Sequence, residues 1–276
     1  MLYVSDLDFT LLKSDTTLSQ KSVECWNLAS KSNKLTIATA RSLTGVKELL
    51  KGLTLKEPLI LLDGVMIADI NGDILHLSSI NKELGDEILN IAKKYLNLEP
   101  LIVAFEDGFE YFLYPKKLNN YQKELLSSMK LRNRIIVDNL KAKDNNLKIV
   151  FQANKDDANA LSKLLKDRFG SNIEIKSSKD PYIDCYFITI LNPKGDKAHA
   201  LKKLEEIEDV SFKNTTVFGD SYNDIGMFKV ASDKIAVANA IDELKEIATE
   251  VLEYSNDEDG VARYLNKRLN LGVDFG

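Results

Sequence analysis

Asp6 and Asp8 are the first side chains in the sequence that could do chemistry, and they directly follow the apolar run Leu2–Ser5. Side chains two positions apart on an extended chain point to the same side, so the two carboxylates are expected to face one pocket. At that distance they repel each other unless a cation or a proton lies between them. Taken alone, an Asp-x-Asp pair is common and more often marks a solvated turn or a helix cap.

A second group of polar side chains follows the predicted strand Thr216–Phe218. It contains Asp220, Asn223 and Asp224, next to Gly219. Two carboxylates and an amide beside a small residue suit a hard cation that prefers oxygen ligands, such as Mg²⁺. Taken alone, the same stretch fits a loop rich in Asp and Asn.

Two further places in the sequence could bind an anion. Thr39 and the backbone from Ala40 to Ser42 lie where a predicted strand meets a predicted helix, and a hydroxyl with helix N-terminal N–H groups binds anions. Capping of that helix by Thr39 or Ser42 explains these residues equally well. Lys197 follows Pro193–Asp196, although a single lysine on a helix is usually solvated surface.

The elements that would position these residues alternate between apolar strands and amphipathic helices at both ends of the chain, which is typical of a parallel sheet covered on both faces. The expected strands are Leu2–Ser5, Leu35–Thr39, Leu59–Leu62, Thr216–Phe218, Ile235–Val237 and Val251–Tyr254. The expected helices are Val23–Ser30 (with Ser19 as N-cap), Thr44–Leu50, Lys197–Glu206, Asp224–Val230, Ile241–Ile247 and Val261–Leu269. Ligands of such sheets bind beyond the carboxyl ends of the strands, where the polar clusters fall.

The pattern changes after Ile80, where neighbouring strands pair and helices lie between them, as in an α+β module. The expected elements are strands at Leu101–Phe105, Tyr111–Tyr114, Ile149–Gln152, Ile173–Lys176 and Cys185–Leu191, with helices at Leu84–Tyr95 and Ala158–Phe169. We therefore predict an α/β protein with a Rossmann-like, doubly wound parallel core built from residues 1–80 and 189–276. An α+β domain at residues 81–188 is inserted into it.

Together the polar clusters supply what phosphoryl transfer needs. The nucleophile and the substrate are both negatively charged, so a divalent cation and a basic side chain must offset their repulsion. A carboxylate nucleophile splits the hydrolysis into two easier steps, and a second carboxylate can protonate the leaving oxygen and later activate water. Because His76 and His199 are the only histidines, a histidine-ligated zinc site is not expected.

These residues resemble the four motifs of the haloacid-dehalogenase superfamily, specifically its Cof-like sugar-phosphatase branch, in the right order along the chain. The matching segments are Asp6–Leu12, Thr39–Arg41, Lys197 and Gly219–Asp224, and Asp259–Ala262 is similar to a C-terminal element of that branch. The long insertion between the second and third motifs resembles the larger cap domain of the family.

The resemblance implies a Mg²⁺-dependent phosphatase that hydrolyses a small phosphorylated metabolite, such as a sugar phosphate, through an aspartyl-phosphate intermediate. It implies that Asp6 is the nucleophile and Asp8 the general acid and base. Thr39, Ala40 and Lys197 would hold the phosphoryl group, and Asn223 would contact phosphate.

The resemblance also implies a set of metal ligands. Mg²⁺ would be bound by the Asp6 carboxylate, the Asp8 backbone carbonyl and Asp220. Asp224 would support the water shell of the metal or hold Lys197. Phe9, Ala40 and Ala198 stand where the family commonly has glycine, and Asp63 where it has asparagine; these departures bear on substrate size and rate more than on mechanism.

Three other functions compete with this prediction. A phosphomutase would share the core and the aspartyl-phosphate but pass the phosphate to a second sugar hydroxyl. A non-catalytic phosphosugar-binding protein would result if Phe9 blocks turnover. A Gly-Asp-Ser esterase, suggested by Gly219–Ser221, needs a histidine base, and no histidine follows Ser221.

Composition narrows the choice of partners and compartment. The formal net charge of −5 argues against a dedicated nucleic-acid binder. No apolar run is long enough for a membrane span, and the chain begins directly with a strand, so we expect a cytoplasmic protein. Cys25 and Cys185 form no cysteine framework. The oligomeric state and the identity of the phosphate ester cannot be read from the sequence.

Overall fold

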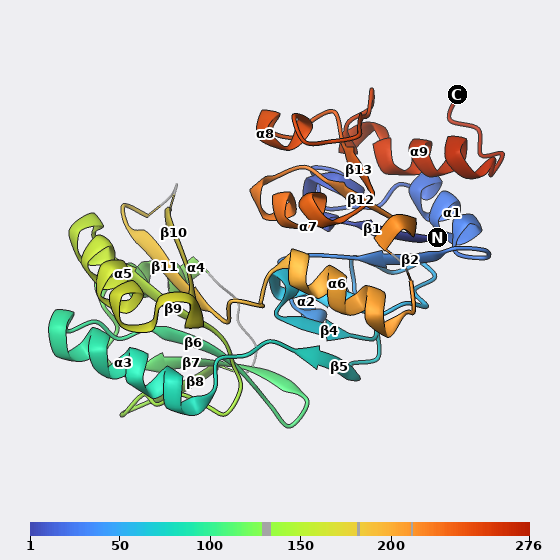
Figure 1. Cartoon of the computed structure of the whole chain (residues 1–276). Coiled ribbons are helices and arrows are strands. Elements are labelled where there is room, and N and C mark those ends of the chain that lie inside the picture. Colours follow the sequence, from blue (N-terminus) through green and yellow to red (C-terminus); the bar gives the residue numbers. More distant parts are fainter. Residues whose placement is uncertain (129–133, 181–182, 211) are drawn as a thin grey trace. The chain divides into compact units, whose positions relative to one another are not determined.

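The computed structural model describes residues 1–128, 134–180, 183–210 and 212–276. They form two compact units, which we describe separately: a core unit, Met1–Leu77 with Lys194–Gly276, and an inserted unit, Ser78–Pro193 (Figure 1). The predicted fold class is confirmed, since one unit holds a parallel sheet between helices and the other a mainly antiparallel sheet. The inserted unit is slightly longer at both ends than the predicted segment 81–188.

The core unit is built on a five-stranded parallel sheet in the order β14-β13-β12-β1-β2. Its strands are β1 (Leu2–Ser5), β2 (Lys34–Ile37), β12 (Thr215–Gly219), β13 (Asp233–Ala236) and β14 (Glu250–Val251). The central strand β1 pairs with β2 on one side and with β12 on the other, with Ser5 opposite Phe218. The two ends of the chain therefore meet in the middle of this sheet.

Helices cover both faces of the parallel sheet, as a doubly wound fold requires. They are α1 (Gln20–Ala29), α6 (Lys197–Ile207), α7 (Ile225–Val230), α8 (Asp242–Lys245) and α9 (Gly260–Leu269). Helix α1 packs against α9 on one face, and α6 packs against α7 on the other (Figure 1). The units β1–α1–β2 and β12–α7–β13 wind outward from the centre of the sheet in opposite directions, so the strand order reverses between β1 and β12. Ligands of such sheets bind at the point of reversal.

Two predictions for the core unit are wrong in detail. The predicted strand at Leu59–Leu62 is present as β3 (Leu59–Leu61), but it meets the parallel sheet through a single parallel bridge, between Ile60 and Ala38, and is not one of the five strands of that sheet. Instead it begins a three-stranded antiparallel sheet with β4 (Met66–Ala68) and β5 (Ile74–Leu77). The predicted helix Thr44–Leu50 shrinks to α2 (Leu43–Val46), a length consistent with the low helix propensity of Gly45 in so short a segment.

A cluster of three ionisable side chains, Lys34, Glu57 and Glu208, lies where β2 begins and α6 ends. Lys34 Nζ donates to Glu208 Oε2 at 2.6 Å and to the Glu208 backbone oxygen at 2.7 Å. Burial, a hydrogen bond to Glu208 and the Glu208 charge raise the pKa of Glu57 to about 7. Although burial opposes it, hydrogen bonds from Glu57 and Lys34 lower the pKa of Glu208. Below about pH 7, a neutral Glu57 therefore donates a hydrogen bond to an ionised Glu208.

We expect this cluster to make the folded state less stable as the pH rises from about 5 to about 7. The folded-state pKa of Glu57 lies above its unfolded value, so its contribution is fully present below the unfolded pKa and is lost as the pH passes 7. Glu57→Gln keeps the hydrogen bond and cannot ionise, so the wild type should lose about 1 kcal/mol more than this variant between pH 5 and pH 8. Urea unfolding at both pH values measures the difference, and equal losses in the two proteins would contradict it.

The inserted unit is built on a six-stranded sheet in the order β10-β11-β9-β6-β7-β8. Its strands are β6 (Leu101–Glu106), β7 (Phe109–Pro115), β8 (Arg134–Val137), β9 (Asn146–Ala153), β10 (Glu174–Lys179) and β11 (Tyr186–Leu191). All pairs are antiparallel except β7 with β8. β8 at the edge was not predicted from the sequence.

Helices lie on both faces of this second sheet. On one face, α3 (Lys82–Leu96) and α5 (Lys155–Phe169) bury Ile88 and Leu161 in the main apolar cluster, against the Ile102 and Leu113 side of the strands. The opposite face holds a small cluster of Leu101, Tyr114 and Leu126, with Leu126 coming from α4 (Asn120–Ser128), a helix not predicted from the sequence. Alternation of side chains along β6 and β7 separates the two clusters.

Within the described parts of the chain, we find no helix with the length and apolar character needed to cross a bilayer. Cys25 and Cys185 are buried free thiols.

Candidate active site

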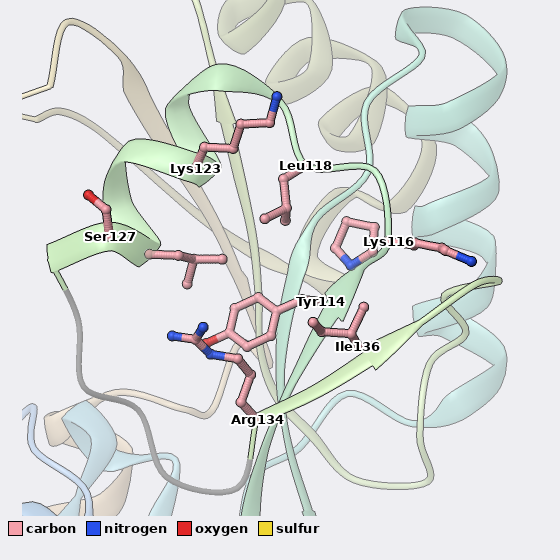
Figure 2. Close-up of a pocket in the computed structure, with 9 residues that line it drawn as sticks. Tyr114, Lys116, Leu118, Lys123, Ser127, Arg134 and Ile136 are labelled. Atoms are coloured by element: carbon pink, nitrogen blue, oxygen red, sulfur yellow. The ribbon is translucent and has the colours of Figure 1, made fainter.

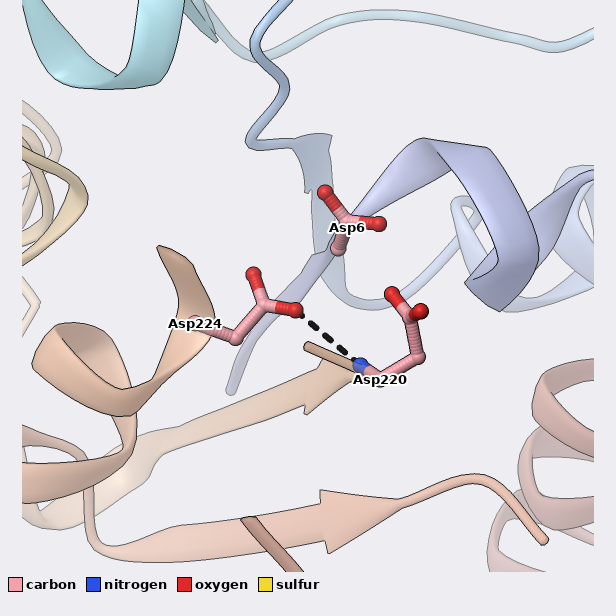
Figure 3. A group of neighbouring side chains, drawn as sticks. All are labelled: Asp6, Asp220 and Asp224. Carbon is pink, nitrogen blue, oxygen red and sulfur yellow. Dashed lines mark hydrogen bonds between the residues drawn. The ribbon is translucent and has the colours of Figure 1, made fainter. Parts of the chain in front are cut away.

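Three carboxylates gather beyond the carboxyl ends of β1 and β12. Asp6 directly follows β1, and Asp220 and Asp224 follow β12; one carboxylate oxygen of each lies within 4.8 Å of the others (Figure 3). The Asp6 N–H donates to the Phe218 oxygen at 2.9 Å, so the strand pairing fixes the Asp6 backbone. The sequence prediction that acidic residues from both ends of the chain meet at one place is therefore fulfilled for these three.

Lys197 at the start of α6 ties two of these carboxylates together. Its Nζ donates to Asp6 Oδ1 at 2.5 Å and to Asp224 Oδ1 at 2.7 Å, and the side chain is fully buried. The other oxygen of Asp224 accepts from the N–H groups of Asp220 and Ser221, at 3.0 and 3.1 Å. Asp224 therefore holds both the lysine and the loop that carries Asp220.

The cluster carries more negative charge than one lysine balances. Burial raises the pKa of Asp6 to about 8, helped by the Asp224 charge and opposed by Lys197. Burial and the Asp224 charge raise the pKa of Asp220 to about 6. Burial alone would lower the pKa of Lys197, but attraction to Asp6 and Asp224 outweighs it and raises that pKa. A divalent cation would stabilise the ionised form of carboxylates whose pKa values are raised in this way.

Asp8 is not one of the three carboxylates whose oxygens lie within 4.8 Å of one another. It accepts two hydrogen bonds from Arg41, from Nε at 2.7 Å and from the second guanidinium nitrogen at 2.6 Å. β1 ends at Ser5 and the chain turns after it, so the two aspartates do not lie together on one strand. The two-residue alternation of a strand does not apply beyond that point.

Hydrogen bonds link the remaining predicted residues into the same network. Thr39 is buried, and its hydroxyl accepts from the Arg41 N–H at 3.1 Å, while its carbonyl accepts from the Asp63 N–H at 2.9 Å. Asn223 donates to the Asp63 carboxylate at 3.1 Å and accepts from the Ser221 hydroxyl at 2.7 Å. These bonds join the loops after β2, β3 and β12, and the pair of Arg41 with Asp8 adds the loop after β1.

Ala40 is exposed, between the buried Thr39 and Arg41. The Ala40 side chain is a single methyl group and cannot donate a hydrogen bond, so any role of Ala40 in anion binding rests on its backbone N–H. This is the role that the sequence assigned to it.

Phe9 occupies a backbone conformation that explains why a glycine is expected at this position. Its φ of 58° lies in the left-handed region, which costs a residue with a side chain roughly 1 kcal/mol. The Phe9 carbonyl accepts from Asn239 Nδ2 at 2.8 Å, which holds the turn in place. The ring remains 54% exposed, so it lies at the surface of the core unit instead of filling its interior.

Gly64 allows the backbone that carries Lys197 to pass close by. A methyl group added to Gly64 would lie within 2.7 Å of Lys197 N and closer still to the Asp196 carbonyl. Its φ of 106° is also a conformation that other residues rarely adopt. The position of Lys197 thus depends on the absence of a side chain at residue 64.

We expect Gly64→Ala to destabilise the core unit by at least about 2 kcal/mol more than Gly72→Ala. Gly72 has a similar φ of 113°, but an added methyl group there would make only an ordinary contact, with Leu43 at 3.5 Å. The control therefore measures the backbone strain alone, and the difference measures the collision with Asp196. Denaturant midpoints of both variants test this; equal midpoints would show that the segment around Lys197 moves aside at little cost.

Three further residues of the network, Thr10, Arg41 and Asp63, had no predicted role. Thr10 donates from its hydroxyl to Asp220 Oδ1 at 3.0 Å, across 210 positions of sequence. Arg41 holds Asp8, and Asp63 holds Asn223. Thr10 and Arg41 stand within the motif segments, and Asp63 directly follows the predicted strand Leu59–Leu62. All three residues follow the end of a predicted strand, and this position was the signal in the sequence that could have identified them as site residues.

Comparison with known proteins identifies the family of this chain. A family model described as haloacid dehalogenase-like hydrolase matches residues 3–265. The chain is 24% identical over 276 residues to 5-amino-6-(5-phospho-D-ribitylamino)uracil phosphatase YitU of Bacillus subtilis, covering 98% of each chain.

Solved structures share the whole fold. The protein TM0651 of Thermotoga maritima is 25% identical, with a TM-score of 0.78 over 96% of each chain. A haloacid dehalogenase-like hydrolase of Bacteroides thetaiotaomicron is 21% identical, with a TM-score of 0.76 over 97% of this chain and 98% of that one. The match of the family model over nearly the full length confirms the resemblance predicted from the motifs: the chain belongs to the haloacid dehalogenase-like hydrolases.

Proposed function

We propose that this hydrolase is a Mg²⁺-dependent phosphatase that cleaves the phosphate ester of a small metabolite through an aspartyl-phosphate on Asp6. The observation that carries the proposal is the group of Asp6, Asp220 and Asp224 around the buried Lys197. A dianionic phosphate needs positive charge in a site whose own groups are mainly negative. A lysine together with a divalent cation would supply it.

The donor set fits Mg²⁺ in its chemistry. Mg²⁺ prefers hard oxygen ligands, often one or two carboxylates, and keeps several waters. Asp6 and Asp220 would hold the ion with the Asp8 backbone carbonyl, while Asp224, engaged with Lys197 and two N–H groups, would orient its surroundings. The bound ion would lower the pKa of Asp6 and help to offset the charge of the phosphate.

Asp6 would act in two steps. In the first, a carboxylate oxygen of Asp6 forms a bond to phosphorus while the ester P–O bond breaks, and Asp8 donates a proton to the departing oxygen. In the second, Asp8 takes a proton from a water molecule, which attacks phosphorus and releases inorganic phosphate and free Asp6. Thr39, the Ala40 backbone, Lys197 and Asn223 would hold the phosphoryl oxygens throughout.

The hydrogen bonds from Arg41 would limit when Asp8 can donate or accept a proton. The paired hydrogen bonds of 2.7 and 2.6 Å hold the Asp8 carboxylate through both of its oxygens. To donate or accept a proton, Asp8 would have to give up at least one of these bonds. Arg41 would then control when Asp8 becomes available, as a residue that positions it.

The core loops alone would not distinguish one phosphate monoester from another. The four loops around the carboxylates would contact the metal and the phosphate group, and the phosphate group is common to all phosphate monoesters. We propose that residues 81–188 act as a cap domain that selects the organic part of the substrate. The relative named as a 5-amino-6-(5-phospho-D-ribitylamino)uracil phosphatase supports phosphorylated sugars and sugar alcohols, including those joined to a heterocycle, as the first candidates.

A phosphate-release screen over phosphorylated metabolites, with Mg²⁺ and with excess chelator, tests the proposal. We expect release of inorganic phosphate from at least one sugar or nucleoside phosphate, and loss of that release when the metal is removed. Full activity in excess chelator would contradict the metal requirement. An isomeric sugar phosphate as the main product would favour a phosphomutase, and binding without turnover across the panel a non-catalytic binding protein.

A further inference from the structure

The inserted unit contains a pocket of about 280 Å³ between α4, the end of β7 and the edge strand β8. Its interior is apolar and its edge is basic. Figure 2 shows Tyr114, Leu118 and Ile136 around its middle, with the Lys116 and Lys123 ammonium groups extending outward at its edge. Leu126 adds a further apolar wall from α4.

Among the described residues, the side chains that line the pocket carry three positive charges and no carboxylate. Lys116 is paired with Asp138 at 2.7 Å, so its charge is partly balanced. Arg134 and Lys123 contribute the other two. The Arg134 guanidinium carbon lies 5.4 Å from the centre of the Tyr114 ring, an arrangement typical of a cation held over an aromatic face.

One wall of the pocket, helix α4, is fastened at its N-terminus by hydrogen bonds. At the N-terminus of α4, Asn119 and Gln122 exchange hydrogen bonds of 2.8 and 3.0 Å between side chain and backbone. Asn119 also donates to the Gln152 oxygen of β9 at 3.0 Å, and Gln122 to the Glu99 oxygen at 2.7 Å. These bonds fasten the helix to the sheet, so binding would require little reorganisation.

We propose that this pocket binds a small organic anion, in which a phosphate or carboxylate group is joined to a ring-sized apolar body. The apolar body would lie among Tyr114, Leu118, Leu126 and Ile136, and the anionic group at the edge near Arg134 and Lys123. A cavity of about 150 Å³ is enough to hold benzene in another protein, so 280 Å³ accommodates a ring with one substituent. The proposal does not depend on the reaction at Asp6.

Methyl NMR spectra of the full-length chain with phenylphosphonate, in the presence of chelator, test the proposal. This probe has a ring and a dianionic group but no ester bond to cleave. We expect saturable shifts of the Leu118, Leu126 and Ile136 methyl groups with a dissociation constant of about 1 mM or tighter. The methyl groups of Ile88 and Leu161, on the other face of the sheet, should not move.

Matched compounds and variants separate the two requirements. Benzyl alcohol lacks the charge and methylphosphonate lacks the ring, so each should bind at least about fivefold more weakly. The double variant Lys123→Gln/Arg134→Gln should weaken phenylphosphonate binding about tenfold or more, whereas Lys163→Gln on α5 should not change it. Unchanged shifts of the Ile88 and Leu161 methyl groups would show that the double variant is folded.

Three results would overturn the proposal: no shifts of the pocket methyl groups at about ten times the expected dissociation constant, equal binding of benzyl alcohol, or full binding by the double variant. The ligand of this class could be the organic part of the substrate or a separate metabolite. A raised KM in the double variant, with kcat unchanged, identifies the substrate as the source. Unchanged kinetics together with lost phenylphosphonate binding identifies a separate ligand.

Discussion

Asp6→Asn should lower kcat by at least about 10⁴-fold while leaving the fold intact. The amide has the shape of the carboxylate but cannot form an acyl phosphate, so the first of the two proposed steps is lost. Lys197 keeps Asp224 as a partner at 2.7 Å, and the buried site keeps its packing. Steady-state phosphate release, with the best substrate from the metabolite screen, measures the effect.

Asp209→Asn is the matched control for this variant. Asp209 is exposed in the core unit and has a φ of 51°, which asparagine adopts as readily as aspartate. The control should keep wild-type kcat and KM, and both variants should unfold close to the wild-type midpoint. Turnover by Asp6→Asn within tenfold of the wild type would exclude Asp6 as the nucleophile.

Lys197→Met should destabilise the folded protein by about 3–5 kcal/mol and abolish phosphatase activity. Lys197 is buried between Asp6 and Asp224, so its removal leaves two buried carboxylates without their cationic partner. Methionine fills a similar volume, which limits the part of the loss that comes from packing. Urea unfolding and phosphate release give the two readouts.

Lys203→Met, on the same helix, shows what the substitution costs where the charge is exposed. Lys203 pairs with Glu206 at 2.8 Å at the surface, an interaction that contributes little in water. Its loss should change stability by less than about 0.5 kcal/mol and leave activity unchanged. If Lys197→Met proved as mild as this control, Asp6 and Asp224 would have to be neutral without the lysine.

The parallel core and three residues of its carboxylate cluster were predictable from the sequence, for a simple physical reason. Apolar strands that end in Asp6 or in Gly219-Asp220 predict both a parallel sheet and the edge of that sheet at which the polar side chains lie. The N-cap of α1 was equally readable, since the Ser19 side chain accepts from the Ser22 N–H as predicted. These features depend on local sequence and on a general property of parallel sheets.

The errors arose where a contact depends on residues distant in sequence. Arg41 binds Asp8 across 33 positions of sequence, a pairing that local alternation cannot foresee. Strand β8 is short and exposed and pairs with β7 in parallel, so its apolar residues gave no buried-strand pattern. The β4–β5 hairpin did carry a usable signal, because Asn71-Gly72 lies at its turn and such pairs favour tight hairpins.

The meeting of both chain ends in the core sheet also determines when the protein can mature during synthesis. A ribosome adds about 5–20 residues per second, so about ten to forty seconds separate Thr10 from its partner Asp220, 210 positions later. During that interval the inserted unit can complete its own sheet, whereas β1 still lacks β12, its neighbour on one side. Nascent chains that stop before residue 215 would hence expose an apolar central strand to chaperones, and the group of Asp6, Asp220 and Asp224 could form only after Asp224 has been added.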